Sequence, residues 1–395
     1  MRNFTFKGLF LTAVFMLLGC LSIQAANDDL ITKQITINLD KAGTLPNMIA
    51  SSEMYKITNL KIIGEINGTD WNMIREMAGR DNRGYGTEGK LSVLDLSEAK
   101  IVKGGDSYYP GDNCYTSNDE IGEKAFTDCS RLTSLTLPVG ITSIGYDAFA
   151  YCSGLTSLTL PAGITSINYG AFLDCSGLTS LTLPDGITSI GSRAFYGCSG
   201  LTSLTLPAGI TSIGDDTFYG CSGLTSLTLP AGITSIGEYA FSGCSGLTSL
   251  TLPAGITSID KYAFSGCSRL TSLTLPAGIT SIGEFAFSYC SGLTSIYVYA
   301  EKVPRIGRYA FEGCASRKCT LYVPKGTYDN YRLSEFGYFE NIVEFDATGI
   351  DKTTTSTDVE EVSRYSVNGQ RLAVPVKGLN IVKYSDGSAR KVVVK

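Results

Sequence analysis

The chain has 395 residues, with 32 basic and 37 acidic side chains, twelve cysteines and no histidine. Without imidazole there is no Ser/His or Cys/His nucleophilic pair and no His-ligated zinc or iron site, so most hydrolases and metalloenzymes are excluded. The net charge of -5 argues against nucleic acid as a partner, because binding to phosphates needs a clustered basic face.

Residues 1–25 have the pattern of a secretory signal peptide, with basic residues before an apolar run over 8–23 and small residues after it. The run is shorter than the roughly 20 residues of a membrane span, and nothing else in the sequence replaces it. We therefore expect export and a mature chain without a transmembrane helix. Cleavage near Ala25 is favoured. Residues 17–20, Leu-Leu-Gly-Cys, offer an alternative lipobox, in which Cys20 would anchor an outer-membrane lipoprotein.

Residues 26–120 are predicted to form an N-terminal cap with irregular repeats. Alternating apolar residues predict strands over 35–39 and 60–66. Thr69-Asp70 is expected to begin a helix that Gly79 ends. A cap of this kind would shield the open end of whatever follows it.

Residues 121–323 form an array of 23-residue units. Cysteines recur every 23 residues from Cys129 to Cys290, and Cys314 follows after 24. A fixed period of this length indicates a solenoid. Each unit contains a strand that ends at a proline, a second short extended piece and about one helical turn, as in residues 237–241. One unit buries too little apolar surface to offset the ordering of its backbone, so the units must stack.

The predicted fold class is therefore a β-rich solenoid of parallel stacked strands with short helical turns, capped at both ends. Residues 324–346 are the predicted C-terminal cap and 347–363 a polar linker. Residues 364–395 are basic and carry hairpin turn signals at Asn368-Gly369 and Asp386-Gly387, which predict a small separate β module.

The pattern Leu-x-x-Leu-x-Leu-Pro, then Ile-x-x-Ile-Gly, Ala-Phe and cysteine, resembles the bacterial leucine-rich repeat of the BspA type. The resemblance implies an exported bacterial surface protein that adheres to a host or cell-surface protein or glycan. The last module resembles the sorting domain of type IX secretion substrates, at Tyr365, Asn368-Gly369, Lys377-Gly378 and 391–395. A scaffold alone does not fix its ligand.

The candidate binding residues are aromatic. Tyr239, Tyr262, Phe285 and Tyr309 occupy the same place in four consecutive units, and Tyr196 and Tyr219 form a shorter row. Stacked units would align them as a stripe, and clustered exposed aromatic residues commonly anchor partners. The alternative is that the rings merely cover the turns of the coils.

The cysteine row is expected to consist of buried, reduced thiols, because parallel side chains about 4.8 Å apart aim past one another. Cys314 and Cys319 leave the register and could pair. No metal or cofactor is predicted, since CxxC spacing and histidine are both missing.

Two other functional classes remain open. Asp215 and Asp216 are adjacent carboxylates, the catalytic device left to a chain without histidine, and would suit a carbohydrate-active enzyme. Outward hydroxyl rows, from Ser134 and Thr136 to Ser272 and Thr274, would suit an ice-binding or structural coat protein. We predict a binding scaffold and not an enzyme.

Overall fold

The computed structural model describes residues 30–109 and 114–347 and, near the C-terminus, 361–366, 371–372, 378–384 and 389–394. The predicted signal peptide, Cys20 and most of the linker lie outside these ranges. The chain divides into two compact units, Met1–Phe345 and Asp346–Lys395. No helix among the described residues has both the length and the apolar character needed to cross a bilayer.

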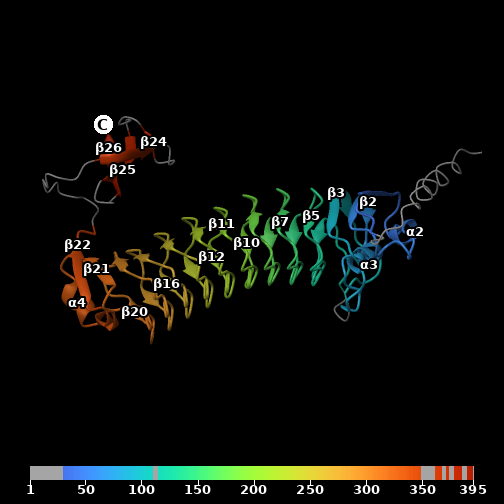
Figure 1. The fold of residues 1–395 in the computed structure, drawn as a ribbon. Coiled ribbons are helices and arrows are strands. Elements are labelled where there is room, and N and C mark those ends of the chain that lie inside the picture. The colour runs from blue at the N-terminus through green and yellow to red at the C-terminus, as the bar shows by residue number, and fades with distance from the viewer. Residues whose placement is uncertain are drawn as a thin grey trace, which may run out of the picture. The chain divides into compact units, whose positions relative to one another are not determined.

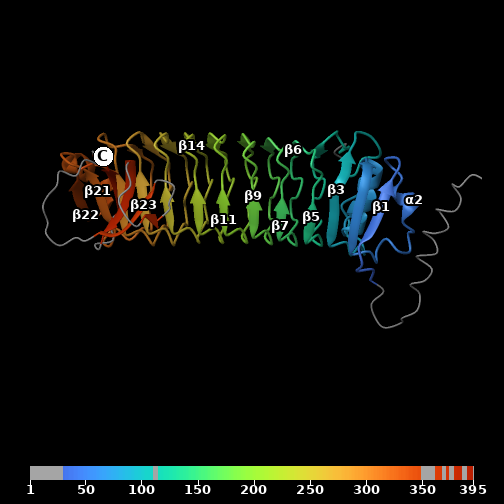
Figure 2. The same cartoon turned by 90° about the horizontal axis from the view of Figure 1, so that it is seen from above.

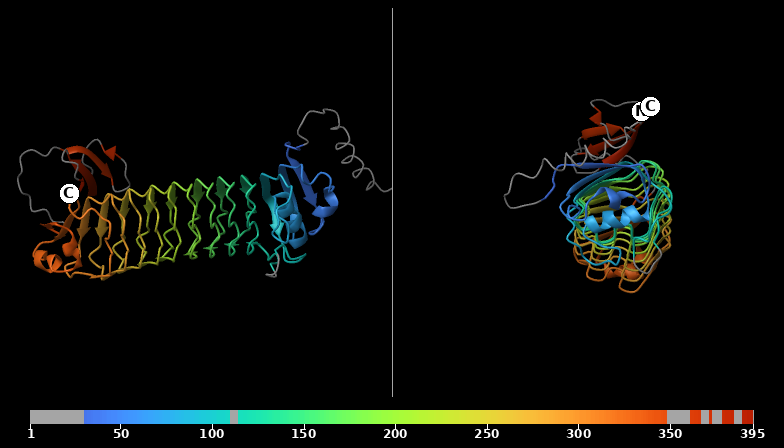
Figure 3. Two further views of the ribbon diagram at one scale, coloured as in Figure 1. Left: turned by 60° about the horizontal axis from the view of Figure 1, so that its bottom comes forward. Right: turned by 90° about the vertical axis from the view of Figure 1, so that its right-hand side faces the viewer.

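The first unit is a stack of coils in which parallel strands lie side by side (Figures 1 and 2). Viewed along the stack, successive coils follow nearly the same outline (Figure 3). This confirms the predicted solenoid. Each coil has three sides: a strand, a two-residue strand and a run of turns.

The N-terminal cap contains β1 (Ile35–Leu39), α2 (Leu45–Met48), β2 (Asn59–Ile66), α3 (Gly68–Met77) and β3 (Val93–Ile101). The two predicted strands are present. Helix α3 begins earlier than predicted, because Asn67 is its N-cap: Asn67 Oδ1 accepts from the Thr69 N–H at 3.0 Å, and Asp70 Oδ2 accepts from the Asn67 N–H at 2.9 Å.

The first side of the array continues the sheet of β1, β2 and β3 with one short strand per coil. These strands are β5 (Ser134–Thr136), β7 (Ser157–Thr159), β9 (Ser180–Thr182), β11 (Ser203–Thr205), β13 (Ser226–Thr228), β15 (Ser249–Thr251), β17 (Ser272–Leu275), β19 (Ser295–Val298) and β21 (Thr320–Pro324). They pair in parallel and in register, as Leu135 with Leu158. The ladder is interrupted between β9 and β11 and between β13 and β15.

The second side carries two-residue strands formed mostly by Ser-Ile pairs. They are β4 (Glu120–Ile121), β6 (Ser143–Ile144), β8 (Ser166–Ile167), β10 (Ser189–Ile190), β12 (Ser212–Ile213), β14 (Ser235–Ile236), β16 (Ser258–Ile259), β18 (Ser281–Ile282) and β20 (Arg305–Ile306). They form one ladder from β4 to β10 and another from β12 to β20. The isoleucines point inward, and most are buried.

The third side corrects the prediction of a helical turn. Residues 238–243 form consecutive turns, and Tyr239, Phe241 and Gly243 donate their N–H groups to carbonyls of the next coil at 3.0, 2.7 and 2.7 Å. Tyr239 (φ 55) and Gly243 (φ 73) have left-handed backbone, which an α-helix does not allow. The same three bonds recur at every junction between neighbouring coils of the array. The third side is thus a hydrogen-bonded ladder between coils.

A single stack of phenylalanine rings fills the interior. Its members are Phe126, Phe149, Phe172, Phe195, Phe218, Phe241, Phe264, Phe287 and Phe311. Neighbouring ring centroids lie 5.1–5.5 Å apart with planes within 9° of parallel. Trp71 covers one end of the stack, 5.1 Å from Phe126. One continuous core therefore runs from cap to cap.

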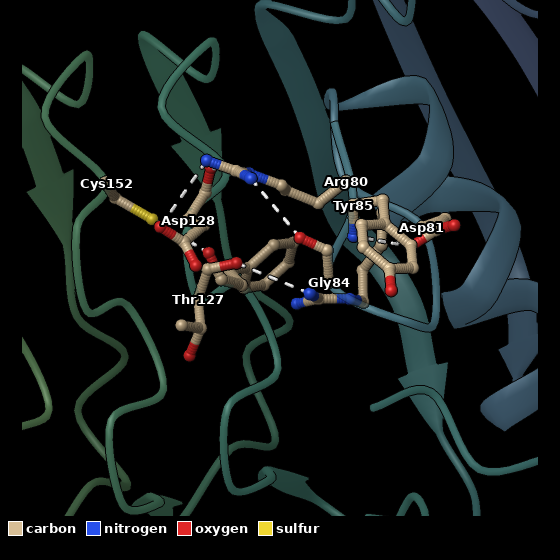
Figure 4. Close-up of polar contacts among 9 residues, drawn as sticks. Arg80, Asp81, Gly84, Tyr85, Thr127, Asp128 and Cys152 are labelled. Carbon is tan, nitrogen blue, oxygen red and sulfur yellow. Dashed lines mark hydrogen bonds and ion pairs between the residues drawn. The ribbon is translucent and has the colours of Figure 1, made fainter. Parts of the chain in front are cut away.

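Side chains of the N-terminal cap replace the coil that would precede the array. Ala125 accepts from Trp71 Nε1 at 2.9 Å and from Arg75 Nη1 at 3.0 Å, while Arg75 Nη2 donates to the Thr127 carbonyl at 3.4 Å. Arg75 is fully buried. Nearby, Arg80 lies between Gly84 and Asp128 (Figure 4) and donates to both carbonyls at 3.3 Å.

The C-terminal cap consists of α4 (Tyr328–Arg332), the 3-10 turn η1 (Glu335–Tyr338) and β22 (Asn341–Phe345), which pairs with β21. The second unit is an antiparallel sheet in the order β24 (Arg371–Leu372), β23 (Glu361–Ser366), β25 (Gly378–Tyr384) and β26 (Ala389–Val394). Its two predicted turns lie outside the described residues.

Candidate binding surface

The six candidate aromatic residues form one continuous row on the third side of the coils. Ring centroids are 4.6 Å apart for Tyr239 and Tyr262, 4.8 Å for Tyr262 and Phe285, and 5.1 Å for Phe285 and Tyr309. Tyr196 and Tyr219 stack at 4.7 Å. Tyr219 then meets Tyr239 edge to face at 6.3 Å. The structure thus joins the two predicted rows, and we call these six residues the aromatic stripe.

Four stripe residues occupy a backbone conformation that bulky side chains seldom adopt. Tyr239, Tyr262, Phe285 and Tyr309 have φ of 55 to 58°. The equivalent residue of each remaining coil of the array also has a positive φ, of 49 to 60°, and these residues are Lys124, Asp147, Gly170, Arg193 and Asp216. Left-handed backbone costs roughly 1–2 kcal/mol for a residue with a side chain. Ring stacking worth about 0.5–1.5 kcal/mol per pair offsets much of this cost.

Stacking decides which part of each ring a partner can reach. The stacked rings cover one another's faces, which leaves mainly their edges accessible. Tyr309, last in the row, is 59% exposed, and the other five stripe residues are half-buried. Burial, followed by the neighbouring ring hydroxyl, raises the pKa of Tyr239 and of Tyr196 further above neutrality. Both phenols are protonated at neutral pH, as ordinary tyrosines are, and can donate hydrogen bonds. The stripe therefore suits contact along its edge.

Charges of alternating sign accompany the stripe. The residues that precede its last four members are Glu238, Lys261, Glu284 and Arg308. They belong to successive coils and so follow one another along the array. A partner at this edge would meet aromatic edges, phenol donors and both signs of charge.

The adjacent carboxylates hold neighbouring coils together. Asp216 Oδ2 lies 3.1 Å from Arg193 Nε, and the Arg193 guanidinium lies over the Tyr169 ring at 5.7 Å. Asp215 Oδ1 accepts from the Glu238 N–H of the next coil at 2.9 Å. Each carboxylate therefore has a partner within the scaffold.

The outward hydroxyl rows of the first side are exposed from β5 to β15 and half-buried at Ser272 and Thr274 on β17. They are in register within each paired segment and broken along the array. Where β9 and β11 separate, a hollow of about 490 Å³ opens, and one of about 400 Å³ lies between β13 and β15. Other threonines act internally, since Thr179 Oγ1 donates to the Thr156 carbonyl at 3.1 Å. The surface therefore lacks an unbroken hydroxyl lattice over its described strands.

The cysteines have a role that the sequence analysis missed. The cysteines from Cys129 to Cys319 are buried free thiols, so Cys314 and Cys319 do not pair with each other. From Cys152 to Cys314, each array thiol donates to the carbonyl of the phenylalanine in the coil before it, as Cys221 Sγ does to Phe195 at 3.1 Å. Burial raises the pKa of the Cys152, Cys175 and Cys221 thiols, and it raises that of Cys198 to about 12. They are hydrogen-bond donors of the core.

A second aromatic cluster was also missed. Tyr297 on β19 and Tyr322 on β21 stack at 4.4 Å, where earlier coils present threonine, and Phe345 meets Tyr297 and Tyr299 edge to face at 6.0 and 5.1 Å. The replacement of threonine by tyrosine in the repeat was the available signal. This cluster closes the first side at its C-terminal end.

The fold and its stacked surface define a leucine-rich repeat scaffold. The chain belongs to the family of proteins with a BspA type leucine-rich repeat region, whose model matches residues 114–225 and 211–331. Repeats of this type are carried by bacterial surface proteins. Among curated proteins, none matches the chain.

Three solved structures illustrate what the chain is similar to. A leucine-rich repeat protein of T. pallidum is 32% identical, with a TM-score of 0.38 over 42% of this chain and 75% of that one. A leucine-rich cell surface protein of Faecalibacterium prausnitzii A2-165 is 24% identical, with a TM-score of 0.33 over 61% and 86%. The pneumococcal vaccine antigen PcpA is 17% identical, with a TM-score of 0.38 over 73% and 80%.

Proposed function

We propose that this protein is an exported bacterial surface protein that binds a host or cell-surface protein or glycan through its aromatic stripe. The observation that carries the proposal is the continuous row that the six rings form across successive coils, with neighbouring centroids 4.6–6.3 Å apart. All six residues are half-buried or exposed, and clustered aromatic residues at a surface commonly anchor partners.

Chemistry favours a protein ligand over a glycan. Sugars commonly pack on aromatic faces, and the stripe covers its own faces by stacking. Its edges offer phenol donors beside Glu238, Lys261, Glu284 and Arg308, which can pair with charges of either sign. A folded protein surface presents acceptors and charges of both signs at this spacing.

The test is binding to immobilised matrix proteins and to a glycan array, with the triple variant Tyr239→Asn, Tyr262→Asn and Tyr309→Asn. Asparagine tolerates left-handed backbone, so the fold should persist. The matched control replaces Tyr151 and Tyr289, which are 47% and 59% exposed and also have positive φ, but lie outside the stripe. We expect the triple variant to lose binding and the control to keep it; equal binding by both would refute the role of the stripe.

We further propose that the ends of the chain direct export, with a signal peptide over 1–25 and a sorting-type module over 364–395. Support comes from the basic, hairpin-forming sequence of the second unit and its antiparallel strands. Fractionating native cells and mapping both termini of the mature chain tests this. Loss of residues after about Ser363 supports the sorting module, whereas a lipidated Cys20 would move the anchor to the other end.

A further inference from the structure

The two ends of the third side differ in how their backbone groups are satisfied. At the N-terminal end, the carbonyls that would face a preceding coil belong to Glu123, Ala125 and Thr127. Tyr108 Oη donates to Glu123 at 2.9 Å, and Trp71 and Arg75 satisfy the other two. This end of the ladder is closed.

The C-terminal end of the same ladder is open. The N–H groups that would face a following coil belong to Tyr309, Phe311 and Gly313, and no acceptor faces them among the described residues. A hollow of about 360 Å³ lies beside them, lined by residues 306–312 with Glu335 and Tyr338. These unpaired donors beside a hollow can donate to one further backbone segment, as the equivalent N–H groups do at the interior junctions.

The interior junctions define what fits this edge. In the preceding coil, Phe285, Phe287 and Tyr289 donate to the carbonyls of residues 308, 310 and 312 at 3.0, 2.8 and 2.6 Å. The missing partner is therefore a backbone segment in the turn conformation of residues 308–312, which presents every second carbonyl. We propose that this edge binds a peptide segment of a partner protein in that turn conformation, with an aromatic residue on the free face of Tyr309.

A second copy of this chain does not fit, because its matching carbonyls are already used by Tyr108, Trp71 and Arg75. The place where the next phenylalanine of the core stack would lie is also occupied, because Phe336 and Phe339 pack on Phe311 with ring centroids 5.6 and 5.3 Å from its own. The inward residue of the peptide must therefore be small. The recognised segment has an aromatic residue followed by small residues.

The probe is the synthetic peptide Gly-Glu-Tyr-Ala-Ser-Ser-Gly, which is residues 237–243 with Phe241→Ser. Amide hydrogen exchange of the full chain is measured with and without it. We expect the Tyr309 and Phe311 amides to exchange much faster than those of Phe264 and Phe287 in the free chain, and to become protected by the peptide.

Two variants localise the binding. Tyr309→Gly keeps the left-handed backbone and removes the ring, and should weaken the peptide about three- to tenfold. Glu335→Trp at the exposed rim should fill the hollow and abolish protection. Tyr239→Asn with Tyr262→Asn is the control and should bind the peptide normally, because the inference does not depend on the rest of the stripe.

Three results would overturn the proposal. The first is protection of Tyr309 and Phe311 in the free chain, which would mean that another segment of the chain covers the edge. The second is a lack of protection at millimolar peptide. The third is protection that survives both Tyr309→Gly and Glu335→Trp, which would place the peptide elsewhere. The two proposals can fail independently. Peptide protection of the edge together with unchanged ligand binding by the stripe variant would refute only the proposed function, and the reverse pair of results would refute only this inference.

Discussion

From Cys152 to Cys314, each array cysteine buries its thiol against a carbonyl, and this pairing explains why cysteine recurs where a small apolar residue would also fit. The Phe195 carbonyl accepts the Cys198 N–H of its own coil at 3.2 Å and the Cys221 thiol of the next at 3.1 Å. Both lone pairs of the oxygen are thereby used. An alanine at this place would fill less space and leave one of them unpaired.

Stability should fall at alkaline pH because of these thiols. The pKa of Cys198 and of Cys244 is raised by burial from 9.0 to about 12, so the folded state holds its protons when the unfolded state loses them. The contribution is complete below pH 9 and is lost as pH rises toward 12. Urea unfolding at a series of pH values measures it. The double variant Cys198→Ser and Cys244→Ser should show a shallower decline; an unchanged slope would contradict this.

The two aromatic rows should differ sharply in their contribution to stability. Phe264 is buried in the core, and Phe264→Ala should lower the free energy of unfolding by about 3–5 kcal/mol. Tyr262→Gly loses stacking but relieves the backbone at φ 57, so we expect a change within about 1 kcal/mol. Chemical denaturation of both variants decides. A loss of several kcal/mol for Tyr262→Gly would assign the stripe to structure instead of binding.

At the scale of elements, α3 acts as a substitute coil. Its capping box fixes where it begins, and its buried face carries Trp71 and Arg75 to the carbonyls of the first coil. An apolar cap would cover the phenylalanine stack and still leave those carbonyls unsatisfied. Such buried polar groups are costly, which explains a fully buried arginine in an otherwise apolar place.

Arg75→Met should open the N-terminal end of the array. It keeps apolar bulk but removes the guanidinium donors to the carbonyls of residues 124 and 127 and one of the two donors to Ala125, and we expect a loss of roughly 2–4 kcal/mol. Hydrogen exchange should then be fastest in the first coils. Arg80→Met is the control: its ion pair with Asp128 is partly exposed and should be worth less than about 1 kcal/mol. Equal effects would contradict a special role for Arg75.

For the whole molecule, stability comes from neighbouring coils, since each contacts mainly the coil before and the coil after it. The core stack, the thiol row and the third-side ladder all repeat with the same period as the sequence. Deleting one full 23-residue unit therefore keeps every kind of contact between neighbouring coils. Deleting part of a unit shifts the register, so that apolar residues meant for the core face solvent and polar residues face the core.

Deletion of residues 222–244, one full unit, should leave a folded solenoid that is shorter by about 4.8 Å. Deletion of residues 222–233 should prevent cooperative folding of the array, because the remaining half unit cannot complete a coil. Circular dichroism and small-angle scattering distinguish the two products. A folded product from both deletions, or from neither, would contradict the nearest-neighbour picture.

The sequence by itself determined the solenoid, its period and its inward face. Cys129 to Cys290 recur without a slip, and apolar residues at fixed places within each unit can be buried only by stacking. The alignment of Tyr239 with Tyr262 followed from the same period. These features depend only on contacts between one unit and the next, so comparing the sequences of neighbouring units was enough to predict them.

Tertiary structure decided the features that depend on backbone direction or on segments far apart in the chain. Because the third side contains left-handed residues, it forms a hydrogen-bonded ladder between coils and not the expected helical turn. Every N–H group that bonds across this ladder donates to the next coil, so the array has carbonyls without a preceding coil at its N-terminal end and N–H groups without a following coil at its C-terminal end. Arg75 closes the first, 50 residues ahead of the Ala125 carbonyl that it satisfies. No period links those residues. Folding places the unpaired carbonyls of the N-terminal end beside the cap, whose side chains satisfy them. The N–H groups of Tyr309 and Phe311 at the other end are left without a partner among the described residues.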